Sequence, residues 1–200
     1  MAISFPLTFP THRGPVSVTI RPKSVNGVNV SPFSLVPQVY KWPGAERWEM
    51  DISFGPMSRA NGEAWNAFFL SLEGPVGSFT VGDPSGQTPR GTATSGVTAT
   101  GSVRATSITL AGSGTLLAGD WISFSSHRWL HKLKKDVTLS GGGVTAEIWP
   151  GLRAALSGAA TATTAAKGRF MLLTESPEWS VDLAGHHHPP MLKAIEDLRP

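Results

Sequence analysis

Alternation of apolar and polar residues predicts a half-buried β-strand over residues 47–54. Trp48, Met50, Ile52 and Phe54 fall on one side of this segment, and polar or charged residues fall on the other. Successive side chains of a strand point to opposite faces of a sheet, so the apolar set is expected to form one layer of the core. The same alternation over residues 179–183 predicts a second strand of that domain.

Helical spacing predicts one amphipathic helix after the first strand. Ser58 is a candidate N-cap, and Gly74-Pro75 marks the end of the helix. Apolar residues recur on one face of the predicted helix at Ala64, Trp65, Phe68, Phe69 and Leu72. A stripe of this width is typical of a helix that docks on a sheet.

Shorter signals surround the strand and the helix. Residues 15–20 and 78–81 alternate as strands, residues 23–37 are rich in the Pro, Asn and Gly of turns, and a last strand is expected near residues 192–198. Together these elements predict a β-sandwich with one packed α-helix.

The middle of the chain differs in composition from its flanks. Residues 91–119 consist almost wholly of Thr, Ser, Gly, Ala and Val, and Arg104 is the only charged residue among them. Short strand signals separated by glycine turns continue to about residue 168, which favours a small barrel. The mostly Ala and Thr segment 154–166 is expected to be a loop or an edge strand that closes this barrel. We therefore predict a mainly β protein: a discontinuous domain of residues 1–90 and 169–200, and an inserted barrel of residues 91–168.

Composition narrows the classes of function. Charged residues make up 16% of the 200 positions, against about 25% in an ordinary soluble domain, which favours a subunit packed against neighbours. The net charge of +3 is too small to indicate a nucleic-acid partner, and the absence of Cys excludes disulfides and thiolate chemistry. The chain has neither the pattern of a signal peptide nor a long apolar window, so we expect synthesis in the cytoplasm and no membrane partner.

Motifs of catalysis and of cofactor binding are missing from the sequence. It contains no phosphate loop, nucleophile elbow or zinc helix, and the run at Gly112-Ser-Gly114 has Leu117 where a dinucleotide fingerprint needs glycine. Glu49 and Asp51 lie two residues apart on one strand face, a geometry that hydrolases use. Arg47 shares that face, which favours a solvent or subunit contact. We expect no catalytic residue and no cofactor.

Three consecutive histidines, His186, His187 and His188, are weak candidates for a metal site. On an extended chain they alternate in direction, so one subunit would present at most two together. Because Gly185 and Pro189-Pro190 flank the run, an exposed turn is the preferred interpretation. In a symmetric ring, however, the same loop would recur around an axis.

Basic and aromatic residues in the insert each allow two interpretations. The basic cluster, Arg128, Lys132, Lys134 and Lys135 with His127 and His131, could face DNA in a channel or form an ordinary solvated strand face with Trp129 and Leu133 inward. The solvated face is favoured. Exposed together, the three tryptophans of the insert would form a sugar-stacking platform, whereas alternation favours a place in its core; they are Trp121, Trp129 and Trp149.

Several motifs resemble, in order and spacing, the distal tail proteins of long-tailed, siphovirus-type bacteriophages. They are Glu63-Ala-Trp-Asn-Ala-Phe-Phe-Leu-Ser-Leu-Glu-Gly, Gly77-Ser-Phe-Thr-Val-Gly-Asp-Pro, Thr88-Pro-Arg-Gly, Ala118-Gly-Asp-Trp-Ile, Leu130-His-Lys, Ala146-Glu-Ile-Trp-Pro-Gly-Leu-Arg153, Lys167-Gly-Arg-Phe170 and Glu178-Trp-Ser. The resemblance covers roughly residues 45–183. The family ends in one continuous closing strand, whereas this chain has Gly185-His-His-His-Pro-Pro190.

The resemblance implies a tail-tube-like β-sandwich, often with an inserted barrel, that forms a hexameric ring at the virion tail tip. Its expected partners are the tail-tube protein, the tail-tip hub protein and, through non-specific contact, the DNA that passes during ejection. Two alternatives remain: a tail-tube or other minor tail subunit, and a carbohydrate-binding β module, which would need clustered exposed tryptophans.

Overall fold

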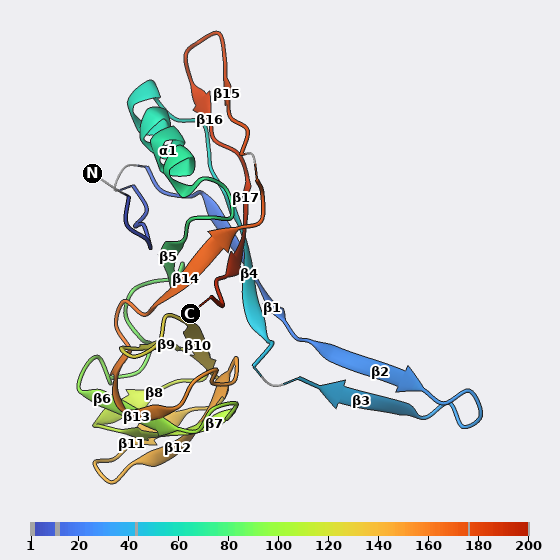
Figure 1. Ribbon diagram of the computed structural model, residues 1–200. Coiled ribbons are helices and arrows are strands. Elements are labelled where there is room, and N and C mark those ends of the chain that lie inside the picture. Colours follow the sequence, from blue (N-terminus) through green and yellow to red (C-terminus); the bar gives the residue numbers. More distant parts are fainter. Residues whose placement is uncertain (1–2, 11–12, 43, 176, 200) are drawn as a thin grey trace.

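A computed structural model describes residues 3–10, 13–42, 44–175 and 177–199. Its central element is a five-stranded antiparallel sheet in the order β1-β4-β17-β14-β5. The strands are β1 (Ser17–Lys23), β4 (Arg47–Ser53), β17 (Leu192–Glu196), β14 (Lys167–Leu172) and β5 (Phe79–Gly82). Strands from both ends of the sequence therefore lie side by side in one sheet (Figure 1).

The helix α1 (Arg59–Leu72) covers one end of this sheet (Figure 1). Its apolar stripe, Trp65, Phe68, Phe69 and Leu72, is buried, and Trp65 packs against Phe54 with ring centroids 4.4 Å apart. Ser58 is the N-cap residue, but its side chain makes no capping hydrogen bond. The helix ends where the glycine predicts: Leu72 is its last residue, Glu73 is the C-cap, and Gly74 follows at the C′ position with a positive φ.

The apolar face of β4 has two different neighbours. Trp48, Met50 and Ile52 are all buried on it. At its C-terminal end the strand leads to Phe54, which lies under α1. Trp48, at the other end, packs against Trp121 and Trp149 from the middle of the chain, with ring centroids 4.7 and 4.3 Å away. The face is buried as predicted, but at Trp48 its covering layer comes from the barrel and not from the helix.

The middle of the chain forms a closed six-stranded barrel in the order β10-β12-β7-β6-β13-β9. Its strands are β6 (Val97–Gly101), β7 (Ser107–Ala111), β9 (Trp121–Phe124), β10 (Leu130–Leu133), β12 (Val144–Trp149) and β13 (Leu156–Ala162). The short strands β8 (Gly114–Leu116) and β11 (Val137–Leu139) pair beside it. The Ala- and Thr-rich segment supplies β13, which pairs with both β6 and β9 and closes the barrel.

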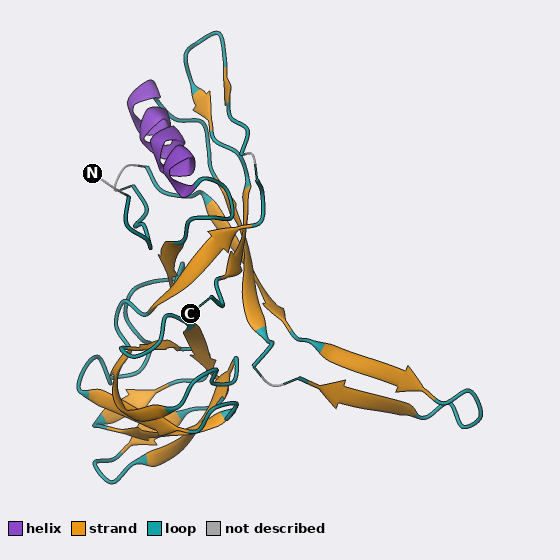
Figure 2. Cartoon of the chain, in the orientation of Figure 1, coloured by secondary structure: helices purple, strands orange, loops and turns teal. Residues whose placement is uncertain are grey.

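Two further hairpins project from the sheet (Figure 2). The first joins β2 (Asn26–Val30) to β3 (Pro37–Lys41) and continues outward from β1 and β4. The turns predicted over residues 23–37 are confirmed at residues 32–34, but the prediction missed the paired strand at residues 26–30. Its signal was the alternation of Val28, Asn29 and Val30, which the neighbouring turn residues obscured.

The second hairpin joins β15 (Ser180–Val181) to β16 (His187–His188) and lies beside α1 (Figure 1). The half-buried strand predicted over residues 179–183 is wrong: Trp179, Val181 and Leu183 are exposed and do not enter the five-stranded sheet. The sequence after the insert returns to that sheet through β14 and β17 instead. The predicted class is confirmed: the protein is mainly β, with one packed helix and a closed barrel.

Candidate functional site

The β2–β3 hairpin, which we call the arm (residues 26–41), exposes a row of valines. Register pairs Val28 with Val39 and Val30 with Pro37, which places these four residues on one face. Val28 and Val39 are each 63% exposed, and Phe33 at the tip is 98% exposed. We call Val28, Val30 and Val39 the valine face.

The opposite face of the arm is polar and aromatic. It carries Asn29, Gln38 and Tyr40, and the Tyr40 hydroxyl donates to Gln38 Oε1 at 3.0 Å. A Cβ at position 27 would collide with the indole of Trp42, so the glycine lets that ring lie close to the strand. The two faces therefore differ in chemistry, and the valine face has the character of a contact surface.

An isolated two-stranded hairpin is only marginally stable in water, and its stability depends on what packs against it. Contiguous exposed apolar side chains on a projecting element mark a site of protein contact. Residues 17–42, which include the arm, contain Arg21, Lys23 and Lys41 and no carboxylate. The arm is thus apolar on one face, and two of the cations at its base, Arg21 and Lys41, pair with Asp51 and Glu46.

The β15–β16 hairpin is the second exposed apolar element. Trp179, Val181 and Leu183 lie before, in and after its short first strand β15, and all three are exposed, Leu183 fully so. Residues 173–185 contain Glu175, Glu178 and Asp182 and no Lys or Arg. We call this hairpin, with the exposed apolar residues of 179–183 and the three acidic residues, the acidic hairpin.

The histidine run shows how this hairpin is fixed to the helix. His187 is buried, and its backbone pairs with Met57 through hydrogen bonds of 2.9 Å in both directions. Its ring occupies the space above Gly62, where a Cβ would overlap the imidazole. The expected exposed turn is therefore wrong for His187, because the glycine on α1 leaves room for that side chain.

His186 and His188 lie on the other side and share one partner. Their imidazoles lie 3.2 and 3.4 Å from Asp182 Oδ2. The backbone amide of His186, assisted by the two rings, lowers the pKa of Asp182 to about 2. Two of the three histidines do point the same way, but within the described ranges no group of three or more His, Cys, Asp or Glu residues has the arrangement of a metal site.

Buried charges join the barrel to the sheet. Arg153, which precedes β13, forms an ion pair of 2.8 Å with Glu196 of β17 and also donates to the backbone carbonyls of Gly44 and Glu46. Burial raises the pKa of Glu196, and Arg153 opposes that rise. A second buried pair, Arg169 of β14 with Asp197 at 2.8 Å, lies within the sheet domain. The barrel is therefore held by specific contacts.

Sequence analysis placed the three tryptophans either on a sugar platform or in the core of the barrel. Trp121 and Trp149 lie instead at the joint with the sheet, against Trp48. Trp129 is half-buried there, and its indole nitrogen donates to the carbonyl of Asp197 at 3.2 Å. These rings do not form a clustered exposed platform.

The structure does not bring the four cations of the basic cluster into one patch. Lys132 lies 4.6 Å above the ring of Trp121, and Lys135 pairs with Glu147 at 2.7 Å. Arg128 precedes the short β10 strand and Lys134 follows it, so these two exposed cations lie beyond opposite ends of that strand. Leu133 points inward as expected.

The two histidines of that segment are not surface cations. His131 is fully buried, and its Nδ1 lies 2.8 Å from the carbonyl oxygen of Pro150. Burial lowers the pKa of His131 to about 3, and burial also lowers that of His127. His131 therefore belongs to the neutral interior of the joint, whereas His127 is half-buried beside it.

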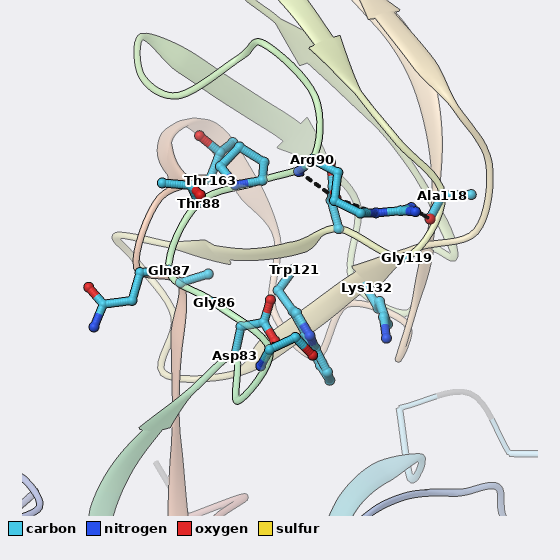
Figure 3. Close-up of a pocket in the computed structure, with 14 residues that line it drawn as sticks. Asp83, Gly86, Gln87, Thr88, Arg90, Ala118, Gly119, Trp121, Lys132 and Thr163 are labelled. Carbon is cyan, nitrogen blue, oxygen red and sulfur yellow. Dashed lines mark hydrogen bonds and ion pairs between the residues drawn. The ribbon is translucent and has the colours of Figure 1, made fainter.

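A pocket of about 430 Å³ lies where the chain enters and leaves the barrel (Figure 3). Asp120 is buried in its wall, where its carboxylate accepts hydrogen bonds from the amides of Arg90 and Leu117 at 3.1 and 2.8 Å. Arg90 also pairs with Asp120 and donates to the Ala118 carbonyl. Because both carboxylate oxygens of Asp120 accept hydrogen bonds, this residue holds the segment around Arg90, which leads into the barrel, against the barrel. For the same reason Asp120 is a poor general base.

Glu49 and Asp51 do share one face of β4, as predicted, among basic partners. Asp51 accepts a 2.6 Å hydrogen bond from Arg21 and lies opposite Lys193 in the register. This arrangement is a cross-strand charge pattern on an accessible sheet face.

Comparison with known proteins finds no family model that matches the chain and no curated protein with significant similarity to it. Among the described residues, no helix has the length and apolar character needed to cross a membrane.

Proposed function

We propose that this protein is a structural subunit of a homo-oligomeric ring at the distal end of a bacteriophage tail. In this role it joins the tail tube to the tail-tip hub and leaves an axial passage for DNA. The observation that carries the proposal is the arm: a hairpin with an exposed apolar face projects from the central sheet. Such an element belongs to an assembling protein.

The resemblance in the order and spacing of the motifs supports the choice of the tail tip. The two-part architecture is also suited to a ring, because the barrel is inserted between β5 and β14 and leaves the β1–β4 side and the arm accessible. Partners of this subunit are then further copies of itself, the tube and the hub. Contact with passing DNA is non-specific in this proposal.

The hydrogen bonds and ion pairs of the carboxylates favour a structural role over catalysis. Asp120, Glu196 and Asp51 are each engaged in hydrogen bonds or ion pairs that hold elements together. The carbohydrate-binding alternative lacks its main requirement, since Trp121 and Trp149 pack at the joint. A tail-tube subunit remains the second candidate, because it would use the same arm in stacked rings.

Native mass measurement of the purified protein, followed by electron microscopy of isolated tails, tests the proposal. We expect a closed oligomer of six chains and six-fold density at the distal end of the tube. Long stacked tubes would favour the tail-tube alternative. A protein that stays monomeric at high concentration and has no place in the virion would defeat the proposal.

A further inference from the structure

We propose that the valine face of the arm docks on the acidic hairpin of a second copy of this chain. The inference rests on the proposed function, because it names the contact that would build the ring. In this contact the arm of one subunit binds the acidic hairpin of the next.

The two surfaces lie at opposite ends of the same strands. The arm leaves the sheet where Lys23 pairs with Arg47. The acidic hairpin lies beyond the other end of β4, past Ser53, where Met57 pairs with His187. Figure 1 shows the two hairpins projecting in different directions from the central sheet. One copy therefore cannot cover its own valine face with its own acidic hairpin.

The chemistry of the two surfaces is complementary. Val28, Val30 and Val39 are exposed on the arm, and Trp179, Val181 and Leu183 are exposed on the acidic hairpin. Two cations at the base of the arm, Arg21 and Lys41, form ion pairs with Asp51 and Glu46. On the acidic hairpin, Asp182 is engaged by His186 and His188. The charges that are complementary between the two surfaces are therefore those of the exposed Lys23 and Glu178. Apolar contact supplies the attraction, and opposite charge at the rim disfavours arm-to-arm pairing.

A contact between two different patches of the same chain is heterologous. Repetition of such a contact produces a ring when the rotation closes and a filament when it does not. A head-to-tail contact of this kind therefore accounts for an oligomer with more than two subunits without any symmetric interface.

The apolar half of the contact is tested with adjacent residues of the arm. Val28→Asp places a charge on the valine face, whereas the control Asn29→Asp places the same charge on the opposite face. We expect Val28→Asp and Leu183→Asp each to raise the concentration of half-dissociation by about tenfold or more, and Asn29→Asp to leave it near that of the parent. Circular dichroism verifies that each variant is folded.

The charged half is tested by exchange. Lys23→Glu and Glu178→Lys should each weaken the oligomer, and the double variant should restore it, because each subunit then carries both reversed charges. Lys134→Glu on the exposed barrel surface is the control and should have no effect.

Proximity is tested directly, since the chain has no native Cys. An equimolar mixture of Val28→Cys and Leu183→Cys should give a disulfide-linked dimer on oxidation, and neither variant alone should do so. A dimer from Val28→Cys alone would show arm-to-arm pairing and overturn the inference. If the Val28→Asp and Leu183→Asp variants still form the ring of the parent, the proposed contact is overturned while the proposed function stays intact. If the parent protein never assembles and is absent from tails, both the contact and the proposed function are overturned.

Discussion

The guanidinium of Arg153 lies 2.8 Å from the carboxylate of Glu196 at the boundary between the barrel and the sheet, and both side chains are almost fully buried. Glu196 Oε1 also accepts a hydrogen bond from the amide of Leu130 at 3.0 Å, so the pair connects three segments of the chain. A buried pair of this kind contributes more to the choice of one arrangement than to net stability. It fixes the barrel relative to the sheet.

Replacing one member of this pair should be costly. Arg153→Met leaves Glu196 buried without its cation and removes the bonds to the carbonyls of Gly44 and Glu46. We expect a loss of about 3–5 kcal/mol in the free energy of unfolding, measured by urea denaturation. Lys135→Met, which breaks the exposed pair with Glu147, is the control and should leave the unfolding curve nearly unchanged. Equal effects of the two changes would contradict the importance of the buried joint.

The apolar stripe of α1 should behave as core. Phe69 is 1% exposed, whereas its neighbour Leu70 is 65% exposed. Phe69→Ala should lower the free energy of unfolding by about 3–5 kcal/mol, and Leu70→Ala should change it by no more than about 0.5 kcal/mol. Thermal denaturation of the two variants measures the contrast. A melting temperature of Phe69→Ala equal to that of the parent would show that the helix is not docked as described.

Strong periodic signals predicted most of the fold. The strand at Trp48 and the helix at Trp65 are evident from spacing alone, because each has one apolar face that must be buried. The barrel was predicted from short strands and glycine turns. The alternation at residues 179–183 led to a wrong prediction, because these residues lie on a projecting hairpin and not in the sheet. Alternation shows which residues share a face but does not show what covers that face.

The candidate contact surfaces were harder to predict. The valines of the arm resemble any short strand in sequence, and only the absence of a neighbouring layer makes them a surface. Likewise, burial of His187 depends on Gly62, which is 125 residues earlier in the chain and leaves space on the helix. Sequence periodicity describes which residues share a face, but contacts between distant segments decide whether that face is covered.

Removal of the barrel should destabilise the remaining sheet. Sequence analysis favours a looped-out module, but Trp121, Leu130 and Trp149 form part of the same core cluster as Trp48. Replacing residues 92–165 with a short Gly/Ser linker keeps β14 intact and exposes Trp48 and Glu196. We expect a product with a markedly lower urea midpoint than the parent. Adding Trp48→Ser and Glu196→Gln should improve the solubility of the deletion product. A deletion product as stable as the parent would show that the joint contributes little to the stability of the sheet.

His131 should make the protein sensitive to mild acid. Because burial lowers the pKa of this ring from 6.5 to about 3, the folded chain keeps it neutral at a pH where the unfolded chain protonates it. Between these values the unfolded state binds more protons, so the free energy of unfolding falls as the pH decreases. The contribution of one such group is about 1.4 kcal/mol for each pH unit below 6.5.

The variant His131→Gln tests this dependence, because an amide can still donate to the Pro150 carbonyl but does not titrate. Parent and variant are compared by urea denaturation at a series of pH values from about 7 down to about 4, where the ring stays neutral in the folded state but becomes protonated in the unfolded state. The parent should lose stability more steeply than the variant as the pH falls. The two curves should converge in slope above pH 7, where the ring is neutral in both states. Parallel curves throughout the acid range would show that His131 is accessible to protons in the folded protein and that the joint is looser than the contacts around Pro150 indicate.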